Sequence, residues 1–143
     1  MLKLLVPVDG SEASQRAADY VIRKMQLYKD GIDVHLLNVQ PQLPYGGHVS
    51  SAVGHTAVDE YHKEEGAKAL APVRQKLDAA GIKYHYHIAV GDPAQVIARY
   101  TQERGIDQIL MGRSGHGAVS DMLLGSVAAK ALELVDVPVV LVK

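Results

Sequence analysis

Glycine and serine residues gather between positions 111 and 126, in a segment that begins MGRSGHG and ends in Gly125 and Ser126. The segment follows an apolar run at 106–111 that predicts a strand, and it precedes residues 127–135, which predict a helix. Glycines let backbone N–H groups approach an anion closely, and a helix N-terminus adds unpaired donors and the positive end of its dipole. The segment therefore indicates a phosphate site, in which Ser126 caps the helix or gives its hydroxyl to a phosphate.

Two common glycine signatures do not match this segment. A Walker A loop ends in Gly-Lys-Ser or Gly-Lys-Thr, whereas Val127 follows Gly125 and Ser126 here. The dinucleotide fingerprint needs a third glycine where this chain has Ser120, and the segment lies late in the chain. The plain alternative is a set of turns that hold no ligand.

Composition restricts the class of protein. The chain has 143 residues, which suits one domain over residues 1–143 with a sizeable core. Its formal net charge of −1 offers no electrostatic footprint for nucleic acid and no basic face for a membrane. Apolar runs are too short to span a bilayer and the first residues suit a strand rather than a signal peptide, so we expect a cytoplasmic protein. The absence of cysteine excludes disulfides, thiolate catalysis and cysteine metal sites.

Short apolar runs alternate with helical segments along the chain. The runs that predict strands lie at residues 2–8, 32–39, 83–90, 106–111 and 137–142. Helices are expected after Ser11, over residues 56–80, after Asp92 and over residues 127–135, with a mobile surface loop over residues 42–55. This order predicts an α/β fold, a single open five-stranded parallel sheet with helices on both faces.

Residues 56–80 form the longest predicted helix. Pro72 inside it predicts a kink or a break. We expect His62 to be a polar residue of the helix surface. The apolar positions that we expect to serve the core are Val58, Tyr61, Ala69, Val73 and Leu77.

Three residues follow predicted strands at the end where an open parallel sheet binds ligands. They are Asp9, Val39 and Gly112, after the first, second and fourth strands. They converge only if the first and fourth strands are neighbours, which this pattern alone leaves open. Asp9 before Gly10 and Ser11 also suits a plain turn and helix cap.

Four short motifs stand out along the chain: VPVDGS at 6–11, LLNV at 36–39, GDP at 91–93 and VPVV at 137–140. The most specific pattern is Gly112, two residues, Gly115, nine residues, then Gly125 and Ser126. Over essentially its whole length the chain resembles the universal stress protein family. The resemblance implies a Rossmann-like sheet of order 3-2-1-4-5, which places the first and fourth strands side by side.

In the ATP-binding branch of that family, this glycine pattern cradles the phosphates. The resemblance implies that this chain binds ATP, with Mg²⁺ bridging the phosphates. The phosphates would meet Gly112, Gly115, Gly125, Ser126 and the N–H of Val127. Asp9 would accept from the ribose hydroxyls, Met111 would lie near the sugar, and Val39 would meet adenine through its backbone. Pro7 and Val8, which lead into Asp9, are counted with the candidate binding residues.

Arg113 and His116 stand at variable positions between the glycines, so the resemblance assigns them no role. As a permanent cation and a protonatable ring, these two side chains can contact phosphate oxygens. Solvated loop residues are the equal alternative, and we keep both as candidates. Lys130, one turn into the last helix, is expected to be a surface lysine.

His85 and His87 share one face of a predicted strand, at a spacing that can hold a metal. The sequence places no third ligand nearby, and alternating Tyr and His residues also suit an exposed face. We therefore expect no metal site in the protein.

The last predicted strand, from Val137 to Val142, is apolar and carries no charge before Lys143. At a sheet edge such a strand needs a cover. We expect a homodimer that pairs these edges about a two-fold axis, as the resembled family commonly does. A helix of the same chain is the alternative cover.

Three classes of function stay open. The leading one is an ATP-binding module for stress-response signalling or protection, without dedicated catalytic residues. A slow ATP hydrolase or autokinase needs a positioned base, for which Asp9 at the ribose end is badly placed and His116 is the remaining candidate. The third is a nucleotide-free dimeric scaffold. The sequence does not separate ATP from AMP or a cyclic nucleotide.

Overall fold

The computed structural model of the chain describes residues 1–42, 55–113 and 125–143. Its elements in chain order are β1 (Leu2–Pro7), α1 (Glu12–Lys24), the short 3-10 helix η1 (Met25–Leu27), β2 (Ile32–Gln40), α3 (His55–Ala79), β3 (Tyr84–Val90), α4 (Pro93–Arg104), β4 (Gln108–Gly112), α5 (Ser126–Leu134) and β5 (Val139–Val142). The predicted alternation of strands and helices is confirmed. Gly115, His116 and nearly all of the loop predicted at 42–55 lie outside the described residues. Within the described part, no helix has the length and apolar character needed to cross a membrane.

All five strands pair in parallel in one sheet of order β3-β2-β1-β4-β5. The predicted α/β fold and its strand order are therefore confirmed. β1 lies at the centre with β4 beside it, and Leu4 and Leu5 stand opposite Gln108 and Ile109. The chain order reverses between these two strands, so their carboxyl ends flank the crevice where such sheets bind ligands.

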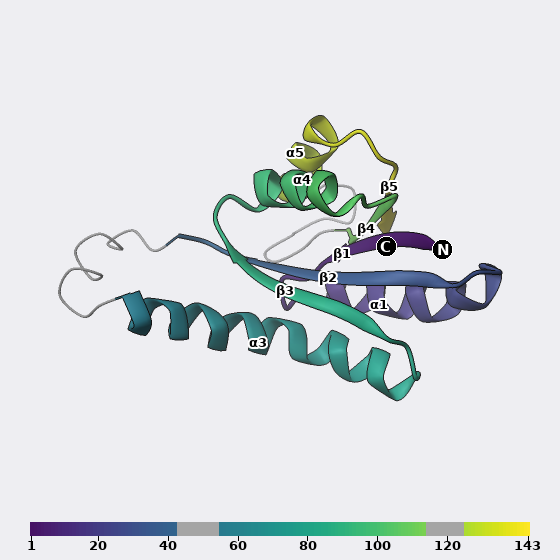
Figure 1. Ribbon diagram of the computed structural model, residues 1–143, viewed down its shortest axis with the longest axis horizontal. Helices are drawn as coiled ribbons and strands as arrows, with labels where there is room; N and C mark the ends of the chain where they lie inside the picture. Colours follow the sequence, from purple (N-terminus) through teal and green to yellow (C-terminus); the bar gives the residue numbers. More distant parts are fainter. Residues whose placement is uncertain (43–54, 114–124) are drawn as a thin grey trace.

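Helices cover both faces of the sheet. α1 and α3 lie on one face, and α4 and α5 lie on the other (Figure 1). The core has two halves: one includes Leu36, Leu70 and Val73 on the side of α1 and α3, and the other includes Leu5 and Ile97 on the side of α4 and α5. The central residues of β1 and β2 are buried on both faces, which explains their continuous apolar runs.

Two helices begin at the predicted caps. The Ser11 hydroxyl accepts from the Ser14 N–H at 3.3 Å, and the Asp92 carboxylate accepts from the Gln95 N–H at 3.1 Å. Pro93 follows Asp92 at the start of α4, where a missing N–H costs no helical hydrogen bond. Local sequence therefore determines where α1 and α4 start.

α3 differs from the prediction in two respects. The helix runs through Pro72 to Ala79, so the break that Pro72 suggested is wrong, while the alternative of a kink stays a prediction. Tyr61 is exposed, whereas His62, expected at the surface, is only 6% exposed. The stripe that faces the sheet is spaced by three or four residues, as one helix face requires. Its buried members are His62, Gly66, Leu70, Val73 and Leu77.

Gly112, the last residue of β4, packs against the first turn of α1. A Cβ built at Gly112 would overlap the backbone carbonyl group of Ala13, which is itself buried. A backbone carbonyl within a helix cannot swing aside as a long side chain can. Glycine is therefore needed here for the packing of α1 on β4, whether or not a ligand binds.

We expect Gly112→Ala to lower the free energy of unfolding by about 3 kcal/mol, because the added methyl group forces α1 away from β4. Gly66→Ala is the comparison variant, in which the added Cβ would meet side-chain atoms of Ile88 at 2.6–2.8 Å rather than a backbone carbonyl. We expect a smaller loss there, because a side chain can shift and alanine improves helix propensity by roughly 1 kcal/mol. Urea unfolding of both variants measures the difference. A Gly112→Ala protein as stable as the wild type would contradict the packing role.

Candidate functional site

A cavity of about 240 Å³ opens at the carboxyl ends of β1 and β4. Residues from β1, α1, β2, α4, β4 and α5, or from the turns beside them, form its wall. This is the place where the reversal of strand order predicts a ligand. The lining residues are Pro7, Val8, Asp9, Ser11, Ser14, Leu37, Val39, Pro93, Ile97, Met111, Gly112, Gly125, Ser126, Val127 and Ala128.

Most of the predicted binding residues meet at this cavity. Those that line it are Pro7, Val8, Asp9, Val39, Met111, Gly112, Gly125, Ser126 and Val127. Arg113 does not line it; the Arg113 N–H donates to the Val142 carbonyl at 2.7 Å. Lys130 is half-exposed, as predicted, and lies 3.6 Å from the carboxylate of Asp92.

The N-terminal turns of three helices line the cavity. α1 contributes Ser14, α4 contributes Pro93, and α5 contributes Ser126 and Val127. Each helix N-terminus carries roughly half a positive charge from its aligned peptide dipoles, together with N–H groups that have no partner within the helix. Backbone dipoles therefore favour an anion in this cavity, although no lysine or arginine is found among its described lining residues.

The start of α5 differs by one residue from the predicted arrangement. Gly125 occupies the N-cap position, with φ −61° and ψ 148°, and Ser126 is the first helical residue. The predicted capping role of Ser126 is therefore wrong, while its role toward a phosphate stays a prediction. Because Gly125 has no side chain, the N-cap residue offers no oxygen that competes with a ligand for the first N–H groups of α5.

Asp9 organises the turn between β1 and α1. Its Oδ1 accepts from the Ser11 N–H at 3.0 Å, from the Ser14 hydroxyl at 2.8 Å and from the Ser11 hydroxyl. The backbone N–H of Asp9 donates to the Ser14 Oγ at 3.0 Å. Asp9 therefore does hold the turn and the start of α1, as the alternative interpretation of this residue predicted. A contact with a ligand would add to this role rather than replace it.

Asn38 ties the end of β1 to β2. Its side-chain amide donates to the Val8 carbonyl at 2.8 Å, and the Val8 N–H donates to the Leu37 carbonyl at 2.8 Å. Asn38 is buried, and its own Oδ1 accepts from the Gln40 amide at 2.7 Å. These bonds hold Val8 and Val39 in the cavity wall.

Sequence reasoning missed several polar and apolar members of the wall. Ser14 and Leu37 had no pattern that marked them as site residues, and Ser11 and Pro93 were identified only as parts of helix starts. Each of these residues lies beside or within a motif at the carboxyl end of a predicted strand. That position marks a residue as part of the site only once the strand order is known.

A second polar cluster lies apart from the cavity. The prediction grouped His85 with His87, but His85 instead lies 3.3 Å from the carboxylate of Asp33, which also contacts His35 at 3.2 Å. The sequence by itself placed no third ligand near His85, and the structure shows where further ligands come from. Strand pairing supplies two more candidate ligands, Asp33 and His35.

Comparison with known families and proteins gives one consistent match. The family model described as the universal stress protein family matches residues 1–143. Universal stress protein MJ0531 of Methanocaldococcus jannaschii is 30% identical over 141 residues, which cover 99% of this chain and 81% of that protein. Universal stress protein YxiE of Bacillus subtilis is 29% identical over 149 residues, with 99% of this chain and 98% of that protein covered.

Solved structures share the fold. The structure of MJ0577 from M. jannaschii superposes with a TM-score of 0.81 at 27% identity, covering 99% of this chain and 95% of that one. A family member from Arabidopsis thaliana, solved with AMP bound, gives a TM-score of 0.69 at 21% identity over 100% of this chain and 92% of that chain. A universal stress protein in complex with cAMP gives 0.69 at 19% identity, over 99% and 97%.

We expect Ser14→Ala to lower the free energy of unfolding by roughly 1–3 kcal/mol, because the buried Ser14 hydroxyl bonds both the N–H and the carboxylate of Asp9. Ser126→Ala is the control, since Ser126 is exposed and a surface change of this kind stays within about 0.5 kcal/mol. Urea unfolding without nucleotide compares the two. Equal stabilities of the two variants would contradict the role of Ser14 in the turn.

Proposed function

The chain belongs to the universal stress protein family, and we propose that it binds ATP as a nucleotide-dependent module of stress signalling or protection in the cytoplasm. The observation that carries the proposal is the cavity between the ends of β1 and β4. Three helix N-termini and one carboxylate line it, at the switch point of an open parallel sheet. Such a wall offers donors to phosphates and an acceptor to sugar hydroxyls.

The proposal gives each part of the nucleotide a matching part of the wall. The phosphates lie at the first turn of α5, where Ser126 and the N–H of Val127 donate, and beside Gly112 and Gly115. Asp9 accepts from the ribose hydroxyls. The neutral backbone of Val39 meets adenine, and Met111 packs near the sugar.

Mg²⁺ accompanies the nucleotide in this proposal. The ion is held mainly by phosphate oxygens and waters in such sites, so the protein needs few ligands of its own. The described cavity wall fits this arrangement, because it holds a single carboxylate and each phosphate oxygen has lone pairs enough to accept a hydrogen bond and bind a cation. When bound, Mg²⁺ offsets part of the phosphate charge.

The choice of ATP rests on the complete glycine pattern at Gly112, Gly115, Gly125 and Ser126, which matches the ATP-binding branch of the family. Two proteins of the same fold carry AMP and cAMP. These ligands share adenine, ribose and one phosphate with ATP, so AMP and cAMP are the informative competitors in a binding test.

Binding is preferred to catalysis because of the groups that line the cavity. Among its described lining residues, Asp9 is the one ionisable side chain, and Ser11 and Ser14 donate to its carboxylate. Hydrolysis or autophosphorylation needs a base or water-positioning group at the terminal phosphate. A slow ATP hydrolase is therefore the second candidate, and labelled ATP measures its turnover directly.

Calorimetric titration of nucleotide-stripped protein with ATP and Mg²⁺ tests the proposal. We expect a dissociation constant in the micromolar range, about −8 kcal/mol, with AMP weaker by at least tenfold, or about 1.4 kcal/mol. Gly115→Val and Asp9→Ala should both abolish the heat at temperatures where each variant is folded. Lys68→Ala, an exposed change on α3, is the control and should bind as the wild type does. No heat and no thermal stabilisation by any of the three nucleotides would leave the nucleotide-free scaffold.

We also propose that two copies of the chain pair through β5. This strand lies at one edge of the sheet, and its residues Val139, Val140 and Leu141 are only partly buried. Leu132 and Leu134 of the preceding helix are 44% and 45% exposed. An uncharged edge strand flanked by exposed leucines suits an isologous interface, in which the same patch meets itself.

Sedimentation of the wild type and of Val140→Glu tests this interface. We expect a dimer for the wild type and a folded monomer for Val140→Glu, because a charge at the paired edge is desolvated without a partner. Val140 also packs against the core on the side of α1, so circular dichroism of the variant is recorded to establish that it is folded. Tyr86→Glu, on the opposite edge strand β3, is the control and should remain dimeric. A monomeric wild type at micromolar concentration, or a dimeric Val140→Glu, would contradict the proposal.

A further inference from the structure

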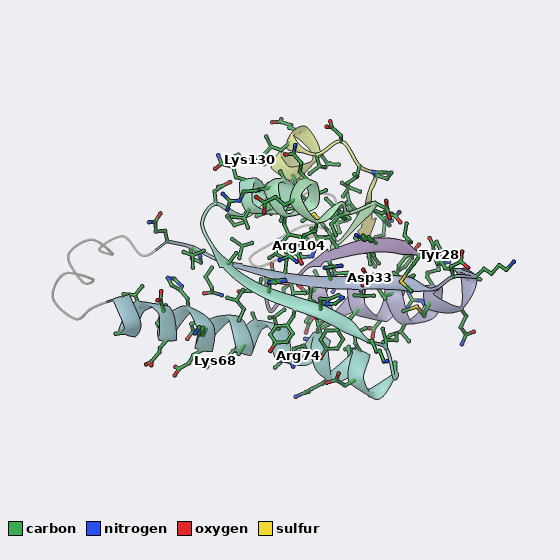
Figure 2. The ribbon with its side chains drawn as sticks, viewed as in Figure 1. Tyr28, Asp33, Lys68, Arg74, Arg104 and Lys130 are labelled. Carbon is green, nitrogen blue, oxygen red and sulfur yellow. The ribbon has the colours of Figure 1, made fainter. Side chains whose placement is uncertain are left out.

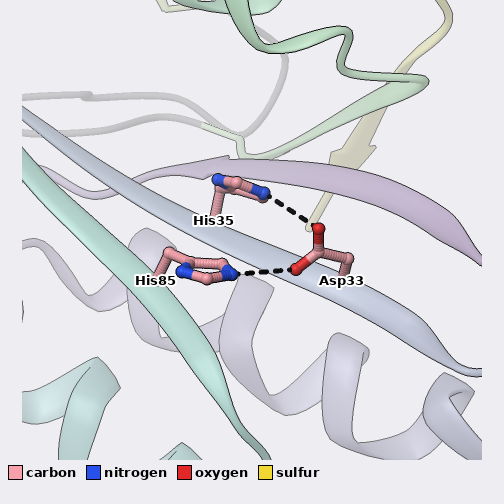
Figure 3. A group of neighbouring side chains, drawn as sticks. All are labelled: Asp33, His35 and His85. Carbon is pink, nitrogen blue, oxygen red and sulfur yellow. Dashed lines mark hydrogen bonds and ion pairs between the residues drawn. The ribbon is translucent and has the colours of Figure 1, made fainter.

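Asp33, His35 and His85 form a compact cluster on the sheet (Figure 3). His35 on β2 and His85 on β3 are direct partners in the parallel register. Asp33 lies two residues before His35, so its side chain shares the same face of the sheet. One ligand atom from each residue lies within 4.8 Å of the other two. Figure 3 shows both rings turning a nitrogen toward the carboxylate.

The distances from each imidazole to the carboxylate match those between ligands of a small transition metal. His35 Nε2 lies 3.2 Å from Asp33 Oδ2, and His85 Nε2 lies 3.3 Å from Asp33 Oδ1. Zinc binds nitrogen and oxygen at about 2.0–2.2 Å, which places two tetrahedral ligands roughly 3.3–3.6 Å apart. We propose that Asp33, His35 and His85 bind a divalent transition metal of the zinc type.

Tyr100 is the positioning residue for His35. The Tyr100 hydroxyl on α4 lies 3.0 Å from His35 Nδ1. Burial lowers the pKa of His35, although Asp33 opposes the shift. The Tyr100 hydroxyl can donate to a bare Nδ1 or accept from a protonated one, so it suits either tautomer of His35. A metal on Nε2 would require the ring proton on Nδ1, where the Tyr100 hydroxyl would accept it, the arrangement that metal-bound histidines show.

The site is open to solvent on one side. The His85 side chain is 63% exposed and the Asp33 side chain is 26% exposed, whereas that of His35 is 9% exposed. A metal therefore reaches the cluster from solvent and keeps room for water as a fourth ligand. The His35 and His85 rings stack at 4.8 Å with planes 30° apart, and the exposed His85 ring is the one free to tilt toward the metal.

The chemical types of the three proposed ligands indicate which metal ions the site prefers. Two imidazoles with one carboxylate suit zinc, copper, nickel or cobalt, while magnesium and calcium prefer oxygen ligands. A cation nearby limits the affinity, because the guanidinium of Arg104 lies 5.3 Å from the Tyr100 ring on the same side of the sheet. Arg74 on α3 belongs to the other face (Figure 2). His87 lies beside Tyr100, and burial lowers its pKa.

The proposed metal site is independent of nucleotide binding. None of Asp33, His35 and His85 lines the cavity between β1 and β4. Failure of one proposal therefore leaves the other intact.

Calorimetric titration of the full chain with Zn²⁺, and separately with Mg²⁺, tests the site. We expect one Zn²⁺ bound in the micromolar range, about 1–10 µM, and no heat from Mg²⁺ at that concentration. His85→Ala and Asp33→Asn should each weaken Zn²⁺ binding by at least about tenfold. His87→Ala, which removes the next histidine on the same face of β3, is the matched control and should change nothing.

Two more readouts separate a metal site from a mere ion pair. Arg104→Gln should tighten Zn²⁺ binding, because it removes a repelling charge.

The visible absorption spectrum of bound Co²⁺ should show the bands of tetrahedral nitrogen and oxygen ligands in the wild type but not in His85→Ala. His85 is largely exposed, so its alanine variant folds and stays informative. Zn²⁺ binding that is unchanged in His85→Ala, or equally lost in His87→Ala, would overturn the proposal.

Discussion

The candidate site depends on one constraint, the parallel pairing of β1 with β4 under a closely packed α1. Gly112 touches the carbonyl group of Ala13 because no Cβ separates them. This approach brings the first turn of α1, and with it the turn of Asp9, to the end of β4. The N-terminus of α5 lines the same cavity through Gly125, Ser126 and Val127. A larger residue at position 112 would therefore disturb the cavity wall before it touched any ligand.

Charge at the cavity comes from the backbone rather than from basic side chains. The described wall includes N-terminal turns of α1, α4 and α5, and its ionisable side chain is the carboxylate of Asp9. Backbone dipoles are fixed by the fold, so they attract an anion without the entropy cost of ordering lysine or arginine side chains. The second polar cluster follows a different principle, since Asp33, His35 and His85 are side chains brought together by strand register on the half of the sheet near α4.

Much of the fold was predictable because its signals are local. Apolar runs marked the strands, and Ser11 and Asp92 marked two helix starts; the strand order followed from the family resemblance. Features that depend on packing or register were not predictable. The face of α3 that holds His62 is chosen by contact with the sheet, and His85 lies fifty positions after His35 and meets it only through strand register. At α5, the observed N-cap residue is Gly125, one residue before the predicted Ser126.

The central claim is that a nucleotide occupies the cavity where β1 and β4 end. Amide chemical shifts of the labelled protein, recorded with and without ATP and Mg²⁺, test this claim most directly. The account predicts that the largest changes fall on residues 8, 9, 11, 14, 37, 39, 97, 111–112 and 125–128, which line the cavity. Changes that are absent at saturating ATP, or that fall on the outer surface of α3, would contradict it.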